Sequence, residues 1–182
     1  MEKNKPGSGG KRVLITGVTG QDGAYLARLL LDKGYQVYGL VARRGSDALW
    51  RLRELRADAG VQLLVGDVTD LSSLLRAIEI AQPTELYNLA AQSFVDKSWD
   101  LPSVTVQVSG MAVTNVLEAI RCTDPKIRFY QATSSEVFGR VQASVQVWQQ
   151  LAPELVSVRL VVPRWKVWHV NLKLLVRFRV RS

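Results

Sequence analysis

The chain has 182 residues, of which 47% are hydrophobic and 22% charged, and its mean hydropathy is near zero, as in an ordinary soluble domain. That apolar content excludes a disordered chain, and Cys122 as the only cysteine excludes a disulfide scaffold. No stretch approaches the ~20 apolar residues that span a bilayer, and residues 1–10 lack the apolar core of a signal peptide. We therefore expect a cytoplasmic protein in a reducing compartment, with no membrane partner.

The net charge of +8 is concentrated at one end of the chain. Residues 1–139 contain 16 Lys and Arg against 15 Asp and Glu, whereas residues 140–182 contain 8 against Glu154 alone. All 13 glycines and all 5 tyrosines lie at or before Gly139. The composition thus predicts a flexible leader over 1–10, a nearly neutral domain over 11–139 and an atypical basic segment over 140–182.

Within 11–139, short apolar runs alternate with segments typical of helices. Strands are predicted at residues 12–16, 36–41, 61–65, 85–89 and 127–132. Helices are predicted at residues 21–33, 48–59, 71–81 and about 102–121. This alternation indicates an α/β fold with an incomplete, Rossmann-like, doubly wound parallel sheet covered by helices on both faces.

A glycine-rich turn, Gly17-Val-Thr-Gly20-Gln-Asp-Gly23, lies between the first predicted strand and the first predicted helix. Glycines there permit a tight turn and close approach of the backbone to a pyrophosphate at the helix N-terminus. The turn favours a dinucleotide site, and the alternative is an ordinary glycine-rich turn.

Two arginines follow the second predicted strand, where the cofactor's ribose would lie. Arg43 is twenty residues after Gly23 and is followed by Arg44. An acidic residue at this distance is typical of NAD sites, whereas arginine suits the 2′-phosphate of NADP. The pair favours NADP, although both side chains could be solvated loop charges.

Four segments together resemble the extended short-chain dehydrogenase/reductase family, and within it the GDP-mannose 4,6-dehydratases. They are the Gly17-x-x-Gly20-x-x-Gly23 turn, Gly66-Asp67-Val68, the Tyr87–Ser93 run YNLAAQS, and the Arg128–Gly139 run RFYQATSSEVFG. The resemblance extends from about Lys11 to Gly139, and we find no such pattern after it.

The resemblance implies which residues would contact the cofactor. The pyrophosphate would be lined by Gly17, Gly20, Gln21, Asp22 and Gly23, the 2′-phosphate by Arg43 and Arg44, the adenine by Asp67 and Val68, and the nicotinamide half by Leu89, Ala90, Ala91 and Ser93. Alternatively, Asp67 caps a turn and the alanines are small only because a strand meets a loop there. At Val104 the family usually has a tyrosine against the cofactor, so that contact is in doubt.

The resemblance also implies the reaction. In these dehydratases a hydride leaves C4 of the mannose, water is eliminated across C5 and C6, and the hydride returns to C6. Glu136 matches the base for the C5 proton, and Ser134 stands where a threonine hydroxyl is usual. The alternative for the Thr-Ser-Ser run is the capped start of a helix. No metal site is predicted.

The Tyr-x-x-x-Lys pair of the family is missing. None of the five tyrosines has a lysine four residues later, so no ammonium is placed to lower the pKa of a phenol. His169-x-x-x-Lys173 has the spacing, but it lies too far beyond Glu136 to match, and we interpret it as incidental.

The basic segment alternates apolar and polar residues from Trp168 to Val180, which predicts a strand. Because it contains no glycine or turn dipeptide, we expect one long exposed strand rather than a hairpin. A change of reading frame or a truncation after Gly139 explains the segment best. The alternatives are a divergent segment that completes the sheet and a basic arm for nucleic acid or an acidic partner, of which nucleic acid is the least favoured.

The sequence therefore predicts an NADP-dependent dehydratase acting on GDP-mannose as its sugar-nucleotide substrate, inactive or impaired in this chain. Another extended short-chain dehydrogenase, either a keto-sugar reductase or an epimerase, is the first alternative. A non-catalytic fragment that binds cofactor or a polyanion is the second. Whether the protein forms a homo-oligomer is left open.

Overall fold

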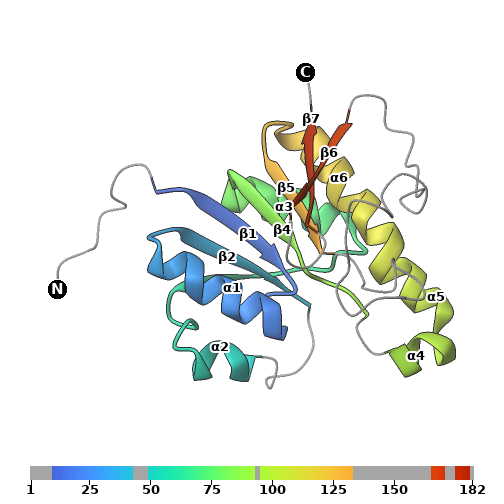
Figure 1. Cartoon of the computed structure of the whole chain (residues 1–182), viewed down its shortest axis with the longest axis horizontal. Coiled ribbons are helices and arrows are strands. Elements are labelled where there is room, and N and C mark those ends of the chain that lie inside the picture. Colours follow the sequence, from blue (N-terminus) through green and yellow to red (C-terminus); the bar gives the residue numbers. More distant parts are fainter. Residues whose placement is uncertain (1–9, 43–48, 93–94, 133–164, 171–174, 181–182) are drawn as a thin grey trace.

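The computed structural model describes residues 10–42, 49–92, 95–132, 165–170 and 175–180. Their sheet has the strand order β3-β2-β1-β4-β5-β7-β6. The first five strands run parallel: β1 (Arg12–Thr16), β2 (Gln36–Val41), β3 (Val61–Val65), β4 (Glu85–Asn88) and β5 (Arg128–Ala132). The strand order reverses direction at β1, so the crevice at the carboxyl ends of β1 and β4 is the switch point where such sheets bind ligands. The predicted Rossmann-like fold is confirmed (Figure 1).

Helices connect the strands and cover the sheet (Figure 1). They are α1 (Gln21–Asp32), α2 (Trp50–Glu54), α3 (Leu71–Ala81), α4 (Val95–Asp100), α5 (Pro102–Thr105), the π-type turn η2 (Val106–Met111) and α6 (Ala112–Thr123).

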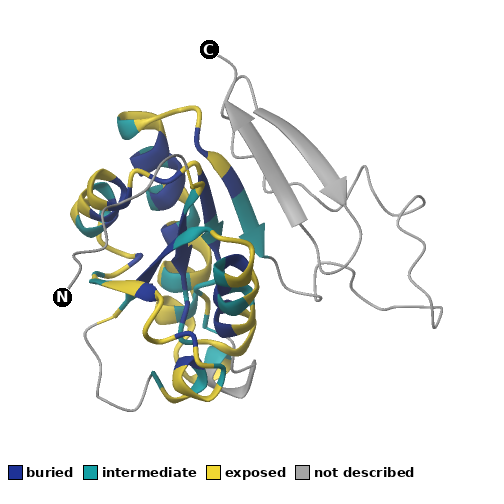
Figure 2. Cartoon of the chain, turned by 90° about the vertical axis from the view of Figure 1, so that its left-hand side faces the viewer, coloured by how far each residue is buried: buried dark blue, intermediate teal, exposed yellow. Residues whose placement is uncertain are grey.

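The alternation of side chains along β1 shows how the two faces are covered. Val13 and Ile15 belong to a buried cluster with residues of α1 and α2, whereas Leu14 belongs to a second cluster with α3 and α6. Successive strand residues point to opposite faces, so a strand that is apolar throughout must be covered on both sides. Buried residues accordingly concentrate in the sheet and on the inner sides of the helices (Figure 2).

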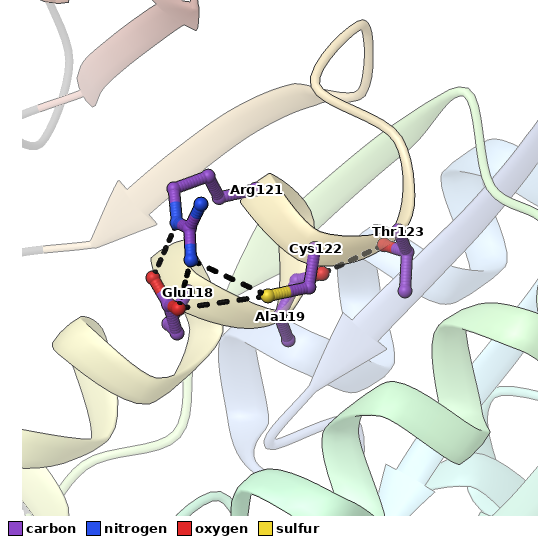
Figure 3. Close-up of polar contacts among 5 residues, drawn as sticks. All are labelled: Glu118, Ala119, Arg121, Cys122 and Thr123. Atoms are coloured by element: carbon purple, nitrogen blue, oxygen red, sulfur yellow. Dashed lines mark hydrogen bonds and ion pairs between the residues drawn. The ribbon is translucent and has the colours of Figure 1, made fainter.

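Polar side chains stabilise the start of α3 and the last turn of α6. Asp70 caps the start of α3, accepting hydrogen bonds from the backbone N–H groups of Ser72 and Ser73, and the hydroxyls of the same serines also lower the pKa of Asp70. At the end of α6 the guanidinium of Arg121 binds both carboxylate oxygens of Glu118, at 2.5 and 2.7 Å, and lowers the pKa of Glu118 to about 2 (Figure 3). The cationic end of this pair lies in the last turn, where it complements the helix dipole.

Two helical predictions need correction, and one helix was not predicted. The second helix covers only Trp50–Glu54 rather than 48–59, because Arg56 adopts a left-handed φ of 51° that ends it. The long helix predicted at 102–121 reaches Thr123 and is interrupted by the π-type turn η2. Helix α4 was not predicted, since six residues are too few for an apolar period to repeat.

The prediction of one long strand in the basic segment was wrong. The backbone forms two strands, β6 (Trp165–Val170) and β7 (Leu175–Val180), which pair antiparallel with each other, and β7 also pairs antiparallel with β5. Four residues separate them in sequence, and connections of this length build hairpins around turns that do not require glycine. The period-two pattern correctly predicted strand conformation, but it did not predict that the segment forms two strands.

An ion pair joins the beginnings of β4 and β5. Arg128 pairs with the carboxylate of Glu85, a side chain that is only 9% exposed, and the hydroxyl of Tyr87 donates to the other Glu85 oxygen at 2.8 Å. An Arg128→Met substitution is expected to destabilise the fold by about 1–3 kcal/mol in urea unfolding, because it leaves a buried carboxylate without its cation. The loss is below that for a fully buried pair because Arg128 itself is partly exposed.

The matched control is Arg121→Met, which removes the cation of an exposed pair within α6. We expect the smaller loss there, since water solvates Glu118 after the substitution. Equal losses in the two variants would contradict the assignment of the Glu85 pair as the buried one.

Candidate functional site

The glycine-rich turn joins β1 to α1 at the switch point of the sheet. Gly17 has a φ of +68°, a conformation that side chains disfavour, and its carbonyl accepts a hydrogen bond from the N–H of Gly20 at 3.0 Å. Gly20 is the N-cap of α1, and no side chain caps this helix start. The first turn of α1 therefore presents its positive end at the carboxyl edge of the sheet, as a pyrophosphate site requires.

Two of the glycines allow backbone segments to lie closer than any side chain would permit. A Cβ on Gly17 would lie 2.7 Å from the carbonyl carbon of Leu89 and 2.8 Å from the nitrogen of Ala90. A Cβ on Gly23 would lie 2.3 Å from the carbonyl oxygen of Gly17. The first glycine thus brings the turn against the loop after β4, and the third packs α1 on the end of β1. A dinucleotide turn uses glycine for the tight turn and for close packing of helix on strand, and the φ of Gly17 and the contacts of Gly23 supply these, so the residues present fit such a cofactor.

Arginine and glycine contacts outside the turn support it from α2 and β2. Nη1 of Arg51 in α2 lies 3.4 Å from the carbonyl oxygen of Thr19, and its guanidinium stacks on Trp50 at 4.4 Å. A Cβ on Gly39 in β2 would lie 2.6 Å from Cγ1 of Val18. The Arg51–Thr19 and Gly39–Val18 contacts were not predicted, because each joins residues that lie far apart in the sequence.

The loop after β3 carries the predicted adenine contacts. Oδ1 of Asp67 accepts hydrogen bonds from the N–H and the hydroxyl of Thr69, at 2.9 and 2.8 Å, so Asp67 caps a turn as its alternative interpretation expected. The side chain of Val68 is buried in the core beside α3 and α6. Any contact of Val68 with a base would therefore use its backbone rather than its side chain.

The loop after β4 lies directly beside the glycine turn. The N–H of Leu89 donates to the carbonyl of Thr16 at 3.2 Å, and the N–H of Ala90 lies 3.3 Å from the Thr16 hydroxyl oxygen. Leu89 and Ala90 pack against opposite core clusters, and Ala91 follows them at the sheet edge. The structure thus brings the predicted pyrophosphate and nicotinamide segments together.

A buried polar network, which the sequence did not predict, joins the ends of three strands at this edge. The hydroxyl of Thr16 in β1 donates to Oδ1 of Asn88 in β4, and Nδ2 of Asn88 donates to Oε1 of Gln131 in β5 at 2.7 Å. Thr16 and Asn88 are 0% and 1% exposed. Fully paired buried networks of this kind are rigid, so the edge that carries both loops is held in one geometry.

Tyr130 in β5 is the tyrosine next to the residues predicted to be catalytic. Its ring lies 5.4 Å from that of Tyr87, and burial together with the negative charge of Asp22 raises the pKa of Tyr130. A phenol with a raised pKa stays protonated at neutral pH. The surroundings of Tyr130 thus favour its neutral form.

Several predicted site residues lie outside the described residues: Arg43, Arg44, Ser93, Ser134 and Glu136. Over the part of the chain that the structure describes, no group of three or more His, Cys, Asp or Glu side chains is placed to hold a metal ion. In the same part, no helix combines the length and apolar character needed to cross a membrane.

Comparison with solved structures finds the same architecture. The UDP-glucose 4-epimerase of Thermus thermophilus, solved in complex with NAD, superposes with a TM-score of 0.64 at 25% identity, covering 78% of this chain and 44% of the epimerase. Epimerase Mth375 of Methanothermobacter thermautotrophicus superposes with a TM-score of 0.63 at 26% identity, covering 75% and 39%. The architecture that they share with this chain is the Rossmann-like sheet and its helices described above.

Comparison with characterised sequences is more specific. The chain is 46% identical over 142 residues to GDP-mannose 4,6 dehydratase 2 of Caenorhabditis elegans and 42% identical over 137 residues to GDP-mannose 4,6 dehydratase of Homo sapiens. These alignments cover 72% and 71% of this chain but only 37% of each relative, so the chain spans little more than a third of their length. A family model described as GDP-mannose 4,6 dehydratase matches residues 14–152, a range that runs past Gly139. The chain therefore belongs to the GDP-mannose 4,6-dehydratase family.

Proposed function

We propose that this chain is an NADP-binding part of a sugar-nucleotide dehydratase whose substrate is GDP-mannose. The observation that carries the proposal is the fit of the glycine turn: Gly17 and Gly23 leave no room for a Cβ, and the start of α1 has no side-chain cap. Family membership supports the substrate and the reaction, since the matched relatives carry the name GDP-mannose 4,6 dehydratase.

Some of the predicted site residues would bind the cofactor, and others would transfer protons. Gly20, Gln21 and Asp22 at the start of α1 would orient the pyrophosphate by their backbone, and Arg43 and Arg44 would bind the 2′-phosphate. Ala91 and Ser93 would border the nicotinamide half. When bound, the cofactor would supply hydride transfer from C4 of the sugar and back to C6.

Two further side chains would act on the sugar. The carboxylate of Glu136 would take the proton from C5 as the C6 hydroxyl leaves, and would return that proton to C5 when C6 is reduced. The departing hydroxide would become water with the proton that O4 loses when the hydride leaves C4. The hydroxyl of Ser134 would donate a hydrogen bond at O4. Both assignments follow from the resemblance of residues 128–139 to the family.

We also propose that the chain, as its sequence stands, has little or no dehydratase activity. The four positions after Tyr130 end at Ser134 rather than lysine, and the pKa of Tyr130 is raised rather than lowered. Formation of a 4-keto sugar nucleotide from GDP-mannose by the purified 182-residue chain would contradict this proposal. The second candidate function, a cofactor-binding chain without catalysis, is favoured by the same observation.

Cofactor choice gives the direct test. Fluorescence titration is expected to show tighter binding of NADPH than of NADH, and the double variant Arg43→Ala/Arg44→Ala is expected to weaken NADPH binding by roughly tenfold to a hundredfold, as the loss of charge-assisted phosphate bonds implies. NADH binding should be unchanged, because NADH has no 2′-phosphate.

Arg53→Ala is the matched control. It removes one exposed cation from α2 nearby, without a proposed phosphate contact, and should leave both affinities unchanged. If the control and the double variant weakened NADPH binding equally, the cause would be general charge attraction and not recognition of the 2′-phosphate.

A further inference from the structure

One continuous helical stretch contacts both loops of the proposed cofactor site. It consists of α5, η2 and α6 in succession, and two of its polar side chains reach backbone groups at the carboxyl edge of the sheet. One contact is to the loop after β3 and the other to the loop after β4.

Asn115 in α6 contacts the loop after β3. Its Nδ2 donates to the carbonyl of Thr69 at 3.0 Å and lies 3.3 Å from the carbonyl of Val68. The carboxylate of Asp67 binds the N–H and hydroxyl of the same Thr69 from within the loop. The Val68 side chain is also buried in the core. This short loop is therefore held by Asn115 at two carbonyls, by Asp67 at its turn, and by burial of Val68.

Ser109 in η2 contacts the loop after β4. Its Oγ accepts a hydrogen bond from the N–H of Gln92 at 3.1 Å. Two residues earlier the N–H of Ala90 is directed at the hydroxyl of Thr16, so the described part of the loop is attached at two points. The π-type turn that carries Ser109 is a rare conformation that is frequent at functional sites.

We infer that Asn115 and Ser109 are positioning residues, each for one half of the bound dinucleotide. Asn115 orients the loop that borders the adenine, and Ser109 orients the loop that borders the nicotinamide half. Because both side chains belong to one helical stretch, that stretch sets the spacing between the two loops. This inference rests on the proposed function, since it assigns the loops to the cofactor.

The experiment compares two ligands that differ only in what lies beyond the adenosine. NADPH spans both loops, whereas adenosine 2′,5′-bisphosphate contains the adenine half alone. Calorimetric titration of the full chain should show that Asn115→Ala weakens the binding of both ligands by about fivefold to tenfold, as the loss of one or two hydrogen bonds implies. Ser109→Ala should weaken the binding of NADPH by about fivefold and leave the affinity for the bisphosphate unchanged.

Two further variants separate positioning from a general effect on the helix. Ser109→Thr keeps the hydroxyl and should restore NADPH binding. Thr105→Val is the matched control: the Thr105 hydroxyl donates to the Leu101 carbonyl within the same helical stretch, at 3.0 Å, and reaches neither loop. It should leave both affinities unchanged.

Amide hydrogen exchange without ligand provides a second readout. Ser109→Ala should speed exchange at the Gln92 amide, and Thr105→Val should not. Equal weakening of both ligands by Ser109→Ala, or no effect of either alanine variant, would overturn the positioning inference alone. Failure of the unsubstituted chain to bind either ligand would overturn the proposed function and this inference together.

Discussion

Replacing Gly23 with alanine is expected to destabilise the chain by about 3 kcal/mol or more and to abolish NADPH binding. The added Cβ would lie 2.3 Å from the carbonyl oxygen of Gly17 and 2.7 Å from Cα of Val18. Both neighbours are backbone atoms, so relief requires α1 to move away from β1. That movement would displace the helix start from the position proposed for the pyrophosphate. Urea unfolding and NADPH titration measure the two effects.

Two other glycines provide graded controls for this prediction. A Cβ on Gly20 would lie 3.1 Å from the Gly17 carbonyl oxygen, which a small shift can relieve, so Gly20→Ala should have an intermediate effect. A Cβ on Gly110 in η2 would meet nothing within 4 Å, and Gly110→Ala should be neutral or stabilising by up to about 1 kcal/mol. Equal losses at Gly23 and Gly110 would show that backbone contact at the turn is not the cause.

An Asn88→Leu substitution is expected to lower the free energy of unfolding by about 2–4 kcal/mol, although leucine has a similar size. It removes the acceptor for the Thr16 hydroxyl and the donor for Oε1 of Gln131, in a place where Thr16 and Asn88 are inaccessible to water. Cofactor affinity should fall as well, because the same hydroxyl faces the N–H of Ala90 in the loop after β4.

A double-mutant cycle tests whether these residues act as a network. Thr16→Val alone leaves Asn88 short of one donor, so it should also be destabilising. In the Asn88→Leu background, Thr16→Val should lower the free energy of unfolding by less, because Oδ1 of Asn88 is no longer present to be left without a donor. Strict additivity of the two losses would contradict the network, and unfolding of the three variants in urea supplies the measurement.

The elements around the proposed site were predicted well because their signals are local. The bounds of β1, β2 and β3 match the expected ranges, since each is a short, largely apolar run, and a glycine directly follows β1 and β3. The glycine spacing predicted a tight turn before a helix, and the φ of Gly17 confirms the turn. Helix α3 was also correct in both bounds, with Asp70 before it and Pro83 after it.

Errors occurred where neighbouring elements decide the conformation. The left-handed Arg56 ends α2 inside a segment whose composition favours a longer helix. The interruption at η2 coincides with the Ser109 contact to Gln92, a residue seventeen positions away, which no helical period contains. The basic segment is divided into β6 and β7, which pair with each other, and only β7 pairs with β5, an arrangement that the period-two pattern does not contain.

By itself the sequence determined the parallel α/β architecture, the position of the glycine turn and the family, because each depends on residues close together in the chain. Only the tertiary structure decided how the turn is supported: Thr16 meets Asn88 across 72 positions, and Asn115 meets Thr69 across 46. The physical reason is that parallel strands bring their carboxyl ends to one edge of the sheet. Polar groups buried at that edge must pair with whatever the alignment places beside them.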